Sequence, residues 1–386
     1  MDFSLNDHQI LIRETVRQFM EAEVRPGVKE WERTETFPAA PIRKMGEMGF
    51  CGMLTPEEWG GPGLDTMSFV LMIEEVARVF AAMSTALAVT NSAVQAPLLE
   101  FGTEAQKKKY LRRLATGEIL GAFCLTEAQA GSDAAAIQAR ALRDGAVYKL
   151  SGTKTWVTNG GVAGVCIVFA KTDPEAGAKG ISAFLVEPGF KGFRAGRHED
   201  KMGQRSSPSV EILLEECEVP AENRLGEEGQ GLKIALSALD GGRIGIAAQA
   251  VGLAQGALDE AVKYAKQRRA FGKTISEFQA IQWMIADMKM EIEAARGLLY
   301  YAACLKDSGG PATAGKRMGA AASKAKLYAS EMANRVVSKA VQIHGSVGYS
   351  RETDVERMYR DARVMTIYEG TSEVQRMIIA RELLGR

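Results

Sequence analysis

The chain has 386 residues, of which 46% are hydrophobic and 25% charged, so we expect a sizeable buried core and two or three domains. Lys plus Arg and Asp plus Glu both number 48, and this balance favours neither nucleic acid nor an anionic membrane as a partner. No apolar run reaches the ~20 residues of a membrane span. The N-terminus Met-Asp-Phe-Ser-Leu lacks the regions of a signal peptide, so a cytoplasmic protein is expected, or a mitochondrial-matrix one if the form is mature and eukaryotic.

The first segment, residues 1–120, is predicted to be mainly helical. Apolar residues recur at helical spacing from Ile12 onward, after a candidate cap at Asn6. Thr103 and Gln106 have the spacing of a capping box before another helix. This segment therefore predicts an N-terminal helical domain.

The second segment, residues 121–231, is predicted to be a small β domain. Short β-type runs occur at residues 146–150, 165–169 and 181–186, and Asp144-Gly145 is a hairpin signal. The glycines at 226–231 have neither the order nor the strand context of a dinucleotide fingerprint. A nicotinamide site is therefore not indicated.

The third segment, residues 232–386, is predicted to be a helix bundle. From Ile281 to Leu299 the apolar residues alternate steps of four and three, which is typical of a long helix buried along one seam. The Ala-rich stretch 312–344 continues the helical pattern. The methionines in the first of these helices are interpreted as core filler: Met284, Met288 and Met290.

Standard catalytic sets are absent from the sequence. His8, His198 and His344 do not pair with a Cys or Ser motif or stand at metal-ligand spacing, so no metal site is expected. The five cysteines are odd in number and lack CxxC spacing, so reduced core thiols are predicted: Cys51, Cys124, Cys166, Cys217 and Cys304.

Four polar, glycine-interrupted clusters lie at segment joints, where functional loops are usual. Residues 123–133 combine glycine with hydroxyls and could hold a ligand or form a plain turn. Trp156 to Gly161 could flank a planar ring, although a lone Trp is more often a core residue. Residues 268–272, a cationic and aromatic break, could grip a pyrophosphate or cap a helix. In the fourth cluster, 367–375, spacing alone makes Glu369 a modest catalytic candidate.

In this order and at these separations, the clusters resemble the acyl-CoA dehydrogenase family over essentially the whole chain. The resemblance is carried by residues 124–133, by Gln342-Ile-His-Gly345 through Arg363, and by Tyr368-Glu-Gly-Thr-Ser372. Residues 240–246 are most similar to the short-chain (butyryl-CoA) branch. The resemblance implies a mainly α fold with an N-terminal helical domain, a middle β-barrel or sandwich domain and a C-terminal four-helix bundle. It also implies bound FAD, a homotetramer that shares its cofactor sites, and an electron-transferring flavoprotein as electron acceptor.

The same resemblance implies roles for individual residues. Glu369 would be the base that removes the α-proton of a fatty acyl thioester while FAD accepts the β-hydride. Some relatives place this base at the position of Gly242, which here has no carboxylate. The residues expected around the flavin ring are Phe123, Leu125, Thr126, Gly131, Ser132, Trp156, Thr158 and Thr371. Those expected at the adenine and pyrophosphate half are Arg268, Phe271, Gln279, Gln342, Gly345 and Ser346.

Substrate contacts are expected from Ser132, Asp240, Arg243, Tyr368 and Gly370. Arg243 has an alternative reading as a helix-surface cation. Two departures from the family pattern are Ser346, where a second glycine is usual, and His344, which we interpret as structural. The overall resemblance to the short-chain branch favours a short, straight acyl chain. Residues 84–94 lack the Arg expected of the glutaryl-specific branch, so a second carboxylate on the substrate is disfavoured.

Several alternatives to this substrate and this activity stay open. Medium-chain, branched or alicyclic acyl groups would suit the same motifs, because chain length depends on pocket depth. An acyl-CoA oxidase would share the base, although oxidases usually carry an additional C-terminal region. A DNA-binding flavoprotein of the same fold is disfavoured, because the charge balance predicts no basic face.

Overall fold

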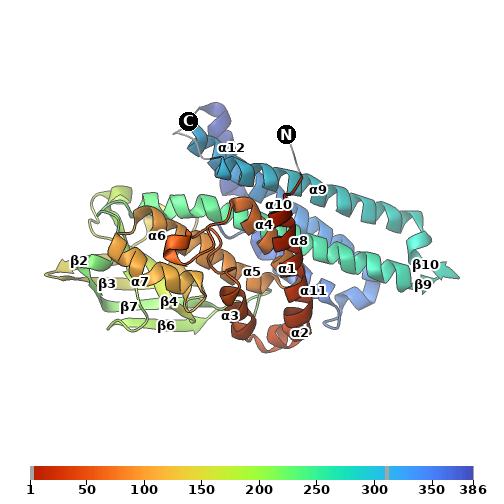
Figure 1. Ribbon diagram of the computed structural model, residues 1–386, viewed down its shortest axis with the longest axis horizontal. Helices are drawn as coiled ribbons and strands as arrows, with labels where there is room; N and C mark the ends of the chain where they lie inside the picture. Colours follow the sequence, from red (N-terminus) through yellow and green to blue (C-terminus); the bar gives the residue numbers. More distant parts are fainter. Residues whose placement is uncertain (1–3, 309–312, 386) are drawn as a thin grey trace.

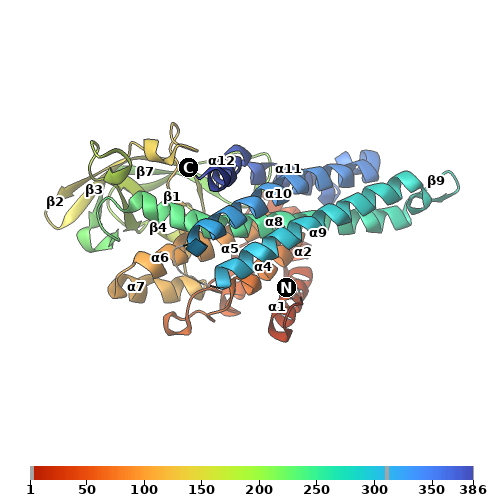
Figure 2. The ribbon, with the colours of Figure 1, turned by 90° about the horizontal axis from the view of Figure 1, so that it is seen from above.

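The computed structural model describes residues 4–308 and 313–385. In both views the strands of the large sheet gather at one end of a largely helical molecule, and a short hairpin of β9 (Arg269–Ala270) and β10 (Lys273–Thr274) lies at the other (Figure 1, Figure 2). This agrees with the mainly α fold class inferred from the sequence. The helices of the first segment are α1 (Asp7–Phe19), α2 (Arg25–Thr34), α3 (Ala39–Glu47), α4 (Thr66–Val79), α5 (Ala81–Ala88), α6 (Ala96–Phe101) and α7 (Glu104–Ala115), with π-helical turns at Met20–Val24 and Val89–Gln95.

The predicted helix caps of this segment are confirmed. The Asn6 side chain accepts a hydrogen bond from the Gln9 backbone N–H, and the Gln9 side chain accepts one from the Asn6 backbone N–H. Thr103 and Gln106 form the same reciprocal box at the start of α7. Each box satisfies backbone donors that a helix start leaves without partners.

The strands of the second segment form one eight-stranded sheet in the order β6-β7-β3-β2-β4-β5-β8, with β1 parallel to β4. The predicted strands are confirmed, and so is the hairpin, since Asp144 pairs with Val147 across a two-residue turn. The bounds are β1 (Leu120–Cys124), β2 (Arg140–Asp144), β3 (Val147–Thr158), β4 (Ala163–Lys171), β5 (Ile181–Val186), β6 (Phe193–His198), β7 (Ser209–Pro220) and β8 (Arg224–Leu225).

The sheet curls around its own apolar core. Tyr148 on β3 and Phe184 on β5 are not on adjacent strands, yet their ring centroids are 5.0 Å apart. A second core lies between the other face of β4 and β5 and helices α6 and α7. The β domain is thereby joined to the N-terminal helices.

The third segment is built on three long helices that lie along one another (Figure 2). Helices α11 and α12 both pack against the last of the three. The bounds are α8 (Gly231–Gln267), β9 (Arg269–Ala270), β10 (Lys273–Thr274), α9 (Gln279–Asp307), α10 (Thr313–His344), α11 (Asp354–Arg363) and α12 (Ser372–Leu384). Within the described part of the chain, no helix is long and apolar enough to cross a membrane.

Helix α8 also packs closely against α4 of the first segment. A Cβ atom at Gly252 would lie 2.1 Å from the Glu74 carbonyl oxygen, and one at Gly256 would lie 2.2 Å from the Arg78 carbonyl oxygen. Because only glycine allows such an approach, these two positions fix α8 against the N-terminal helices. Both helices contribute to one continuous apolar core.

The seam predicted for α9 is confirmed from Met288 to Leu299, since Met288, Ile292, Ala295 and Leu299 are all buried. Two details of the sequence interpretation were wrong. Met290 is 64% exposed and is therefore not core filler. Cys304 is also exposed, whereas the other four cysteines are buried.

Candidate active site

Glu369 lies in the short loop between α11 and α12, in a backbone conformation that few side chains adopt. Its φ is 53°, and that of Gly370 is 88°. Thr371 then caps α12 by accepting a hydrogen bond from the Val374 backbone at 3.3 Å. Left-handed residues cost free energy and persist where the surrounding structure holds them, which is common at functional sites.

The Glu369 carboxylate is enclosed and poorly satisfied. Its Oε2 atom is buried and has no hydrogen-bond partner among residues 4–308 and 313–385. Burial raises the pKa of Glu369 to about 7, and the charges of Arg243 and Lys326 oppose that rise. A carboxylate with these properties is a stronger base than an exposed one at neutral pH.

Helix α8 makes room for this carboxylate at Gly242. A Cβ atom there would stand 2.5 Å from Glu369 Oε2 and 2.8 Å from its Cδ. Position 242, where the family resemblance leads us to expect the base of some relatives, thus lies directly beside the carboxylate in this chain. A side chain at 242 and the present position of the Glu369 carboxylate exclude each other.

Two buried side chains that sequence reasoning missed hold the loop that carries Glu369. Lys326 on α10 donates to the Gly370 carbonyl at 2.7 Å. Gln375 on α12 donates to the carbonyls of Glu369 at 3.1 Å and Gly370 at 2.9 Å. Both Lys326 and Gln375 are 0% exposed. The sequence signal for Lys326 was a single charge on the helical face shared by buried Ala322, Ala329 and Ala333.

Asp240 and Arg243 form an ion pair of 2.6 Å one helical turn apart on α8. Arg243 is 6% exposed, so the alternative reading as a helix-surface cation was wrong. Burial raises the pKa of Asp240, and the charges of Arg243 and Lys306 oppose the rise. The charge of the buried Arg243 guanidinium also acts on Glu369, whose pKa it lowers.

Tyr368 belongs to a buried polar network that the sequence did not reveal. Its hydroxyl donates to Gln249 and accepts from Gln204 at 3.2 Å. Gln249 in turn donates to Thr85 at 2.6 Å and to Ser84 at 2.9 Å. Because Gln204 comes from the loop between β6 and β7, this network ties the Glu369 loop to the β domain.

The flavin-ring candidates gather in the β domain. The Thr155 backbone donates to the Thr126 carbonyl at 2.9 Å, which joins the loop after β1 to β3. Buried Lys154 strengthens the junction by donating to Glu127 at 2.7 Å and to the Leu125 carbonyl at 3.1 Å. Leu125 is buried, Phe123, Thr126 and Thr158 are half-buried, and Gly131 and Ser132 are exposed.

Trp156 does not belong to the core, although a lone Trp usually would. It is 58% exposed and has a φ of 59°. An indole held open in a strained conformation at a strand end leaves a large flat face free for a ligand. This geometry fits the planar ring of a flavin.

The adenine-half candidates lie at the opposite end of the molecule from the β domain, by hairpin β9–β10 (Figure 1). All six are exposed: Arg268, Phe271, Gln279, Gln342, Gly345 and Ser346. His344 joins the end of α10 to α8, because its ring stacks on Tyr264 with centroids 4.4 Å apart. Along α10 this end is about 27 Å from Lys326 at 1.5 Å per residue. Within one chain, the two halves of the predicted cofactor site are therefore not brought together.

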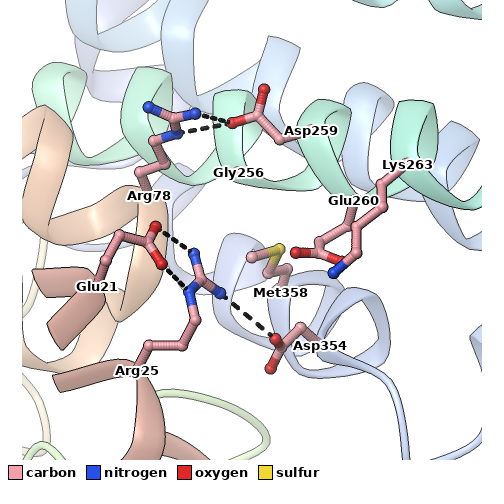
Figure 3. Close-up of a pocket in the computed structure, with 9 residues that line it drawn as sticks. All are labelled: Glu21, Arg25, Arg78, Gly256, Asp259, Glu260, Lys263, Asp354 and Met358. Atoms are coloured by element: carbon pink, nitrogen blue, oxygen red, sulfur yellow. Dashed lines mark hydrogen bonds and ion pairs between the residues drawn. The ribbon is translucent and has the colours of Figure 1, made fainter. Parts of the chain in front are cut away.

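A pocket of about 390 Å³ lies between the N-terminal helices, α8 and α11 (Figure 3). Its charged residues pair with one another: Arg78 with Asp259 at 2.6 Å, and Arg25 with both Glu21 and Asp354. Its lining residue Gly256 is about 21 Å along α8 from Gly242. This pocket is an ion-pair network between segments, and it offers no free group for chemistry.

A second pocket borders the Glu369 loop. It is lined by the end of α11, the segment that follows it, the start of α12 and the facing part of α10: Glu331, Asn334, Arg363, Thr366, Ile367, Thr371, Ser372 and Glu373. The volume is about 330 Å³. Thr371, a predicted flavin contact, thus faces an open space beside the candidate base.

A strained, open indole in a β domain and an enclosed carboxylate between buried cations are features of a flavin-dependent oxidoreductase. Family profiles described as the N-terminal, middle and C-terminal domains of acyl-CoA dehydrogenase match residues 6–118, 122–217 and 229–384. The chain belongs to the acyl-CoA dehydrogenase family, and its reaction is the FAD-dependent dehydrogenation of an acyl-CoA.

Similar proteins cover the whole chain. A short-chain-specific acyl-CoA dehydrogenase of Clostridium acetobutylicum is 46% identical over 99% of this chain and 100% of its own. The caffeyl-CoA reductase-Etf complex subunit CarC of Acetobacterium woodii is 47% identical over 97% of this chain and 98% of its own. The solved structure of butyryl-CoA dehydrogenase from Megasphaera elsdenii has a TM-score of 0.96 and 46% identity, with 100% of both chains covered.

Proposed function

We propose that Glu369 is the base of this dehydrogenase and that the acyl group is short and straight. The observation that carries the first part is the enclosed carboxylate, with Oε2 unpartnered in the described part of the chain and a pKa of about 7. Gly242 leaves that carboxylate its space. The product would be the trans-2-enoyl thioester.

The residues of this chain would act as follows. The thioester carbonyl accepts a hydrogen bond from the Glu369 backbone N–H, which stabilises the enolate-like charge as it develops. The Glu369 carboxylate then takes the proton from Cα. FAD, when bound, would supply the acceptor for the hydride that leaves Cβ. Tyr368 and the Asp240–Arg243 pair flank the acyl and pantetheine parts of the substrate, together with Ser132 and Gly370.

The residues proposed to hold FAD divide into two sets. Trp156, Thr158 and the loop from Phe123 to Ser132 would surround the ring, and Thr371 would also contact FAD. Trp156 supports this assignment because its ring is open although its backbone is strained. The second set, around Phe271 and Gln342, would hold the adenine half of a cofactor bound by another copy of the chain.

Glu369→Gln tests the base. Gln keeps the size of the side chain and loses its ability to accept a proton, so turnover should fall by roughly 10²- to 10⁴-fold. The yellow cofactor should stay bound, because Glu369 is not proposed to hold it. Turnover of acyl-CoA by Glu369→Gln at the wild-type rate would contradict the assignment.

A short acyl chain is supported by the polar network around Tyr368. Gln249 is about 10 Å along α8 from Gly242. An acyl chain that leaves Glu369 along α8 would meet the hydroxyl and amide groups of Tyr368, Gln249 and Thr85 after a few carbons. Those groups already bond one another, and a longer apolar chain would have to break these bonds at a cost of about 1–3 kcal/mol for each group left unpaired.

A panel of straight-chain acyl-CoAs, from C4 to C16, tests the chain length by the loss of flavin absorbance at fixed protein concentration. The highest kcat/KM is expected for the C4 and C6 thioesters. A preference for C12 or longer would contradict the proposal. A preference for branched or alicyclic groups of similar size would correct it.

We also propose that four copies assemble. The exposed face of α9 and the adjoining hairpin carry large apolar side chains: Phe271 at 93% exposure, Trp283 at 62%, Met290 at 64% and Tyr301 at 41%. Such a surface is unusual for a monomer. Light scattering coupled to gel filtration should give four times the chain mass of 41.7 kDa, and a monomer would contradict the proposal.

We propose an electron-transferring flavoprotein as the electron acceptor, which is supported by the Etf complex named for the Acetobacterium woodii relative. That relative is called a reductase, so the direction in the cell depends on the acceptor that is present. Anaerobic turnover with an electron-transferring flavoprotein should exceed turnover with oxygen. Reoxidation by air as fast as turnover would instead indicate an acyl-CoA oxidase. We place the enzyme in the cytoplasm, or in the mitochondrial matrix for a eukaryotic source.

A further inference from the structure

Lys326 is a lysine buried in the middle of an apolar helix face. Its side chain is 0% exposed, and its Nζ atom donates to the Gly370 carbonyl at 2.7 Å. Burying an ammonium group is costly unless a nearby group compensates its charge. The carbonyl supplies a hydrogen bond and no charge, so the compensation has to come from an acidic group.

The enclosed carboxylate of Glu369 is the acidic group that acts most strongly on Lys326. Burial lowers the pKa of Lys326 to about 8, and Glu369 opposes that fall. The other acidic groups that face Lys326 are Glu331 on α10 and Glu373 on α12. Their side chains are 38% and 78% exposed, so solvent screens them.

From the side of Glu369, two cations face the carboxylate: Arg243 from α8 and Lys326 from α10. Arg243 is already engaged with Asp240 at 2.6 Å, and Lys306 from α9 also faces that aspartate. Tyr368, the preceding residue, is the other titratable group that feels the Glu369 charge. Arg243 has the larger electrostatic effect of the two on Glu369, and Lys326 is the second buried cation, which also donates a hydrogen bond to the loop that carries Glu369.

We propose that Lys326 is a positioning residue for the base: its hydrogen bond holds the Gly370 carbonyl, and its charge keeps the enclosed Glu369 carboxylate ionised. This inference rests on the proposed role of Glu369. The two contributions can be separated, because Gln at position 326 can still donate a hydrogen bond but carries no charge, whereas Arg keeps the charge.

The test is the pH dependence of flavin reduction by a saturating short-chain acyl-CoA, between pH 5.5 and 9.5, in the FAD-loaded enzyme. Wild type should lose rate as the pH falls through about 7, where Glu369 takes up a proton. In Lys326→Gln this acidic limb of the pH–rate profile should shift to higher pH by roughly one pH unit. The reason is that an opposite charge near a carboxylate lowers its pKa by that much or more, and the variant lacks that charge. The deficit relative to wild type should be about tenfold at pH 6 and less than about twofold at pH 9.

Lys326→Arg should keep the limb at the wild-type pH. Lys324→Met is the matched control, since Lys324 is two residues away on α10, is half-buried with 42% of its side chain exposed, and pairs with Glu382 at 2.8 Å. A folded, yellow Lys326→Gln enzyme whose limb has not moved overturns the inference, whatever its rate. If Lys326→Gln does not fold, a limb of Lys326→Arg at higher pH than wild type overturns it, and a limb at or below the wild-type pH supports it.

The result is distinguishable from a failure of the proposed function. If Glu369→Gln is inactive and the limb of Lys326→Gln stays at the wild-type pH, only the role of Lys326 is wrong. If Glu369→Gln is active, the base itself has been misassigned.

Discussion

The neighbourhood of Glu369 and the far end of the molecule, around hairpin β9–β10, are built in opposite ways. Around Glu369 the important side chains are buried and bond to groups of the same chain, as Lys326 and Gln375 do. Around the hairpin the candidates are exposed, and Phe271 is 93% exposed. The first region is held by hydrogen bonds within one chain, whereas the second exposes apolar and cationic groups at the surface.

This difference indicates what each region can tolerate. A buried site has little free space, so even a small added atom should displace the reacting group. An exposed site has room for a new side chain, and a substitution there should affect the ligand and leave the fold intact. The predictions below test that contrast, beginning with the largest expected effect.

Gly242→Ala should reduce turnover by roughly 100-fold, the effect expected of a misplacement of about 1 Å. The added Cβ would stand 2.5 Å from Glu369 Oε2, so the carboxylate must move. FAD content and thermal stability should remain close to wild type. Steady-state kinetics and flavin absorbance measure both quantities.

Gly245→Ala is the control for this substitution. The nearest atoms to a Cβ at Gly245 are 3.6 Å away, which is an ordinary contact. The variant should therefore keep its activity and gain slight helix stability. Full activity in Gly242→Ala would mean that the carboxylate at 369 is not required where it lies.

Arg268→Ala should weaken FAD binding by roughly 10- to 100-fold, because a hydrogen bond to a charged group contributes about 1.5–3 kcal/mol. Arg268 is exposed, so the melting temperature of the FAD-free protein should not change. Titration of the apoprotein with FAD, followed by fluorescence, gives the affinity. Unchanged affinity would place the pyrophosphate elsewhere and would remove the contrast between the two regions.

The pH dependence of wild-type turnover should show about a tenfold lower rate at pH 6 than the plateau above pH 8, since Glu369 titrates at about 7. The sign for stability follows from the same pKa. Because burial raises the pKa above its ordinary value of 4.5, the folded state holds a proton that the unfolded chain releases. The group therefore favours folding below pH 4.5, and this contribution is lost as the pH rises to about 7.

Thermal melts at pH 5 and pH 8 measure this contribution to stability. The fall in melting temperature between the two pH values should be smaller in Glu369→Gln than in wild type. An equal fall would show that the carboxylate is not buried in the folded protein.

The contrast between the regions also explains what the sequence could predict. Caps at Asn6 and Thr103, the hairpin at Asp144 and the seam of α9 depend on near neighbours in the chain, and each was predicted correctly. The network of Tyr368 with Gln249 and Thr85 joins residues more than 100 positions apart. No local pattern encodes such a meeting.

Burial was the second quantity that local patterns misjudged. The sequence allowed Arg243 to be interpreted as a surface cation. It is in fact 6% exposed, because α8 is covered on nearly all sides in this stretch. Trp156 is 58% exposed although aromatic residues are usually buried. In both cases the residue departs from its usual environment at the candidate site, where function rather than packing decides the position.

The smallest effect is expected at His344. This residue lies near the exposed end around hairpin β9–β10, but its side chain is buried and bonded within the chain, as the side chains around Glu369 are. Its Nδ1 atom is 2.8 Å from the Ala340 carbonyl, and its ring stacks on Tyr264. His344→Phe should keep the stack and lose the hydrogen bond, at a cost of about 1 kcal/mol. For a chain of 386 residues this corresponds to a fall in melting temperature of roughly 1 °C.

FAD affinity decides whether His344 is structural. In His344→Phe it should stay within about twofold of wild type, since the histidine is 6% exposed and its ring is already occupied by Tyr264. His344→Ala, which also removes the stack, should lower the melting temperature further while FAD affinity again changes little. A tenfold loss of FAD affinity in His344→Phe, with the melting temperature of the apoprotein unchanged, would move His344 into the cofactor-binding set with Gln342 and Gly345.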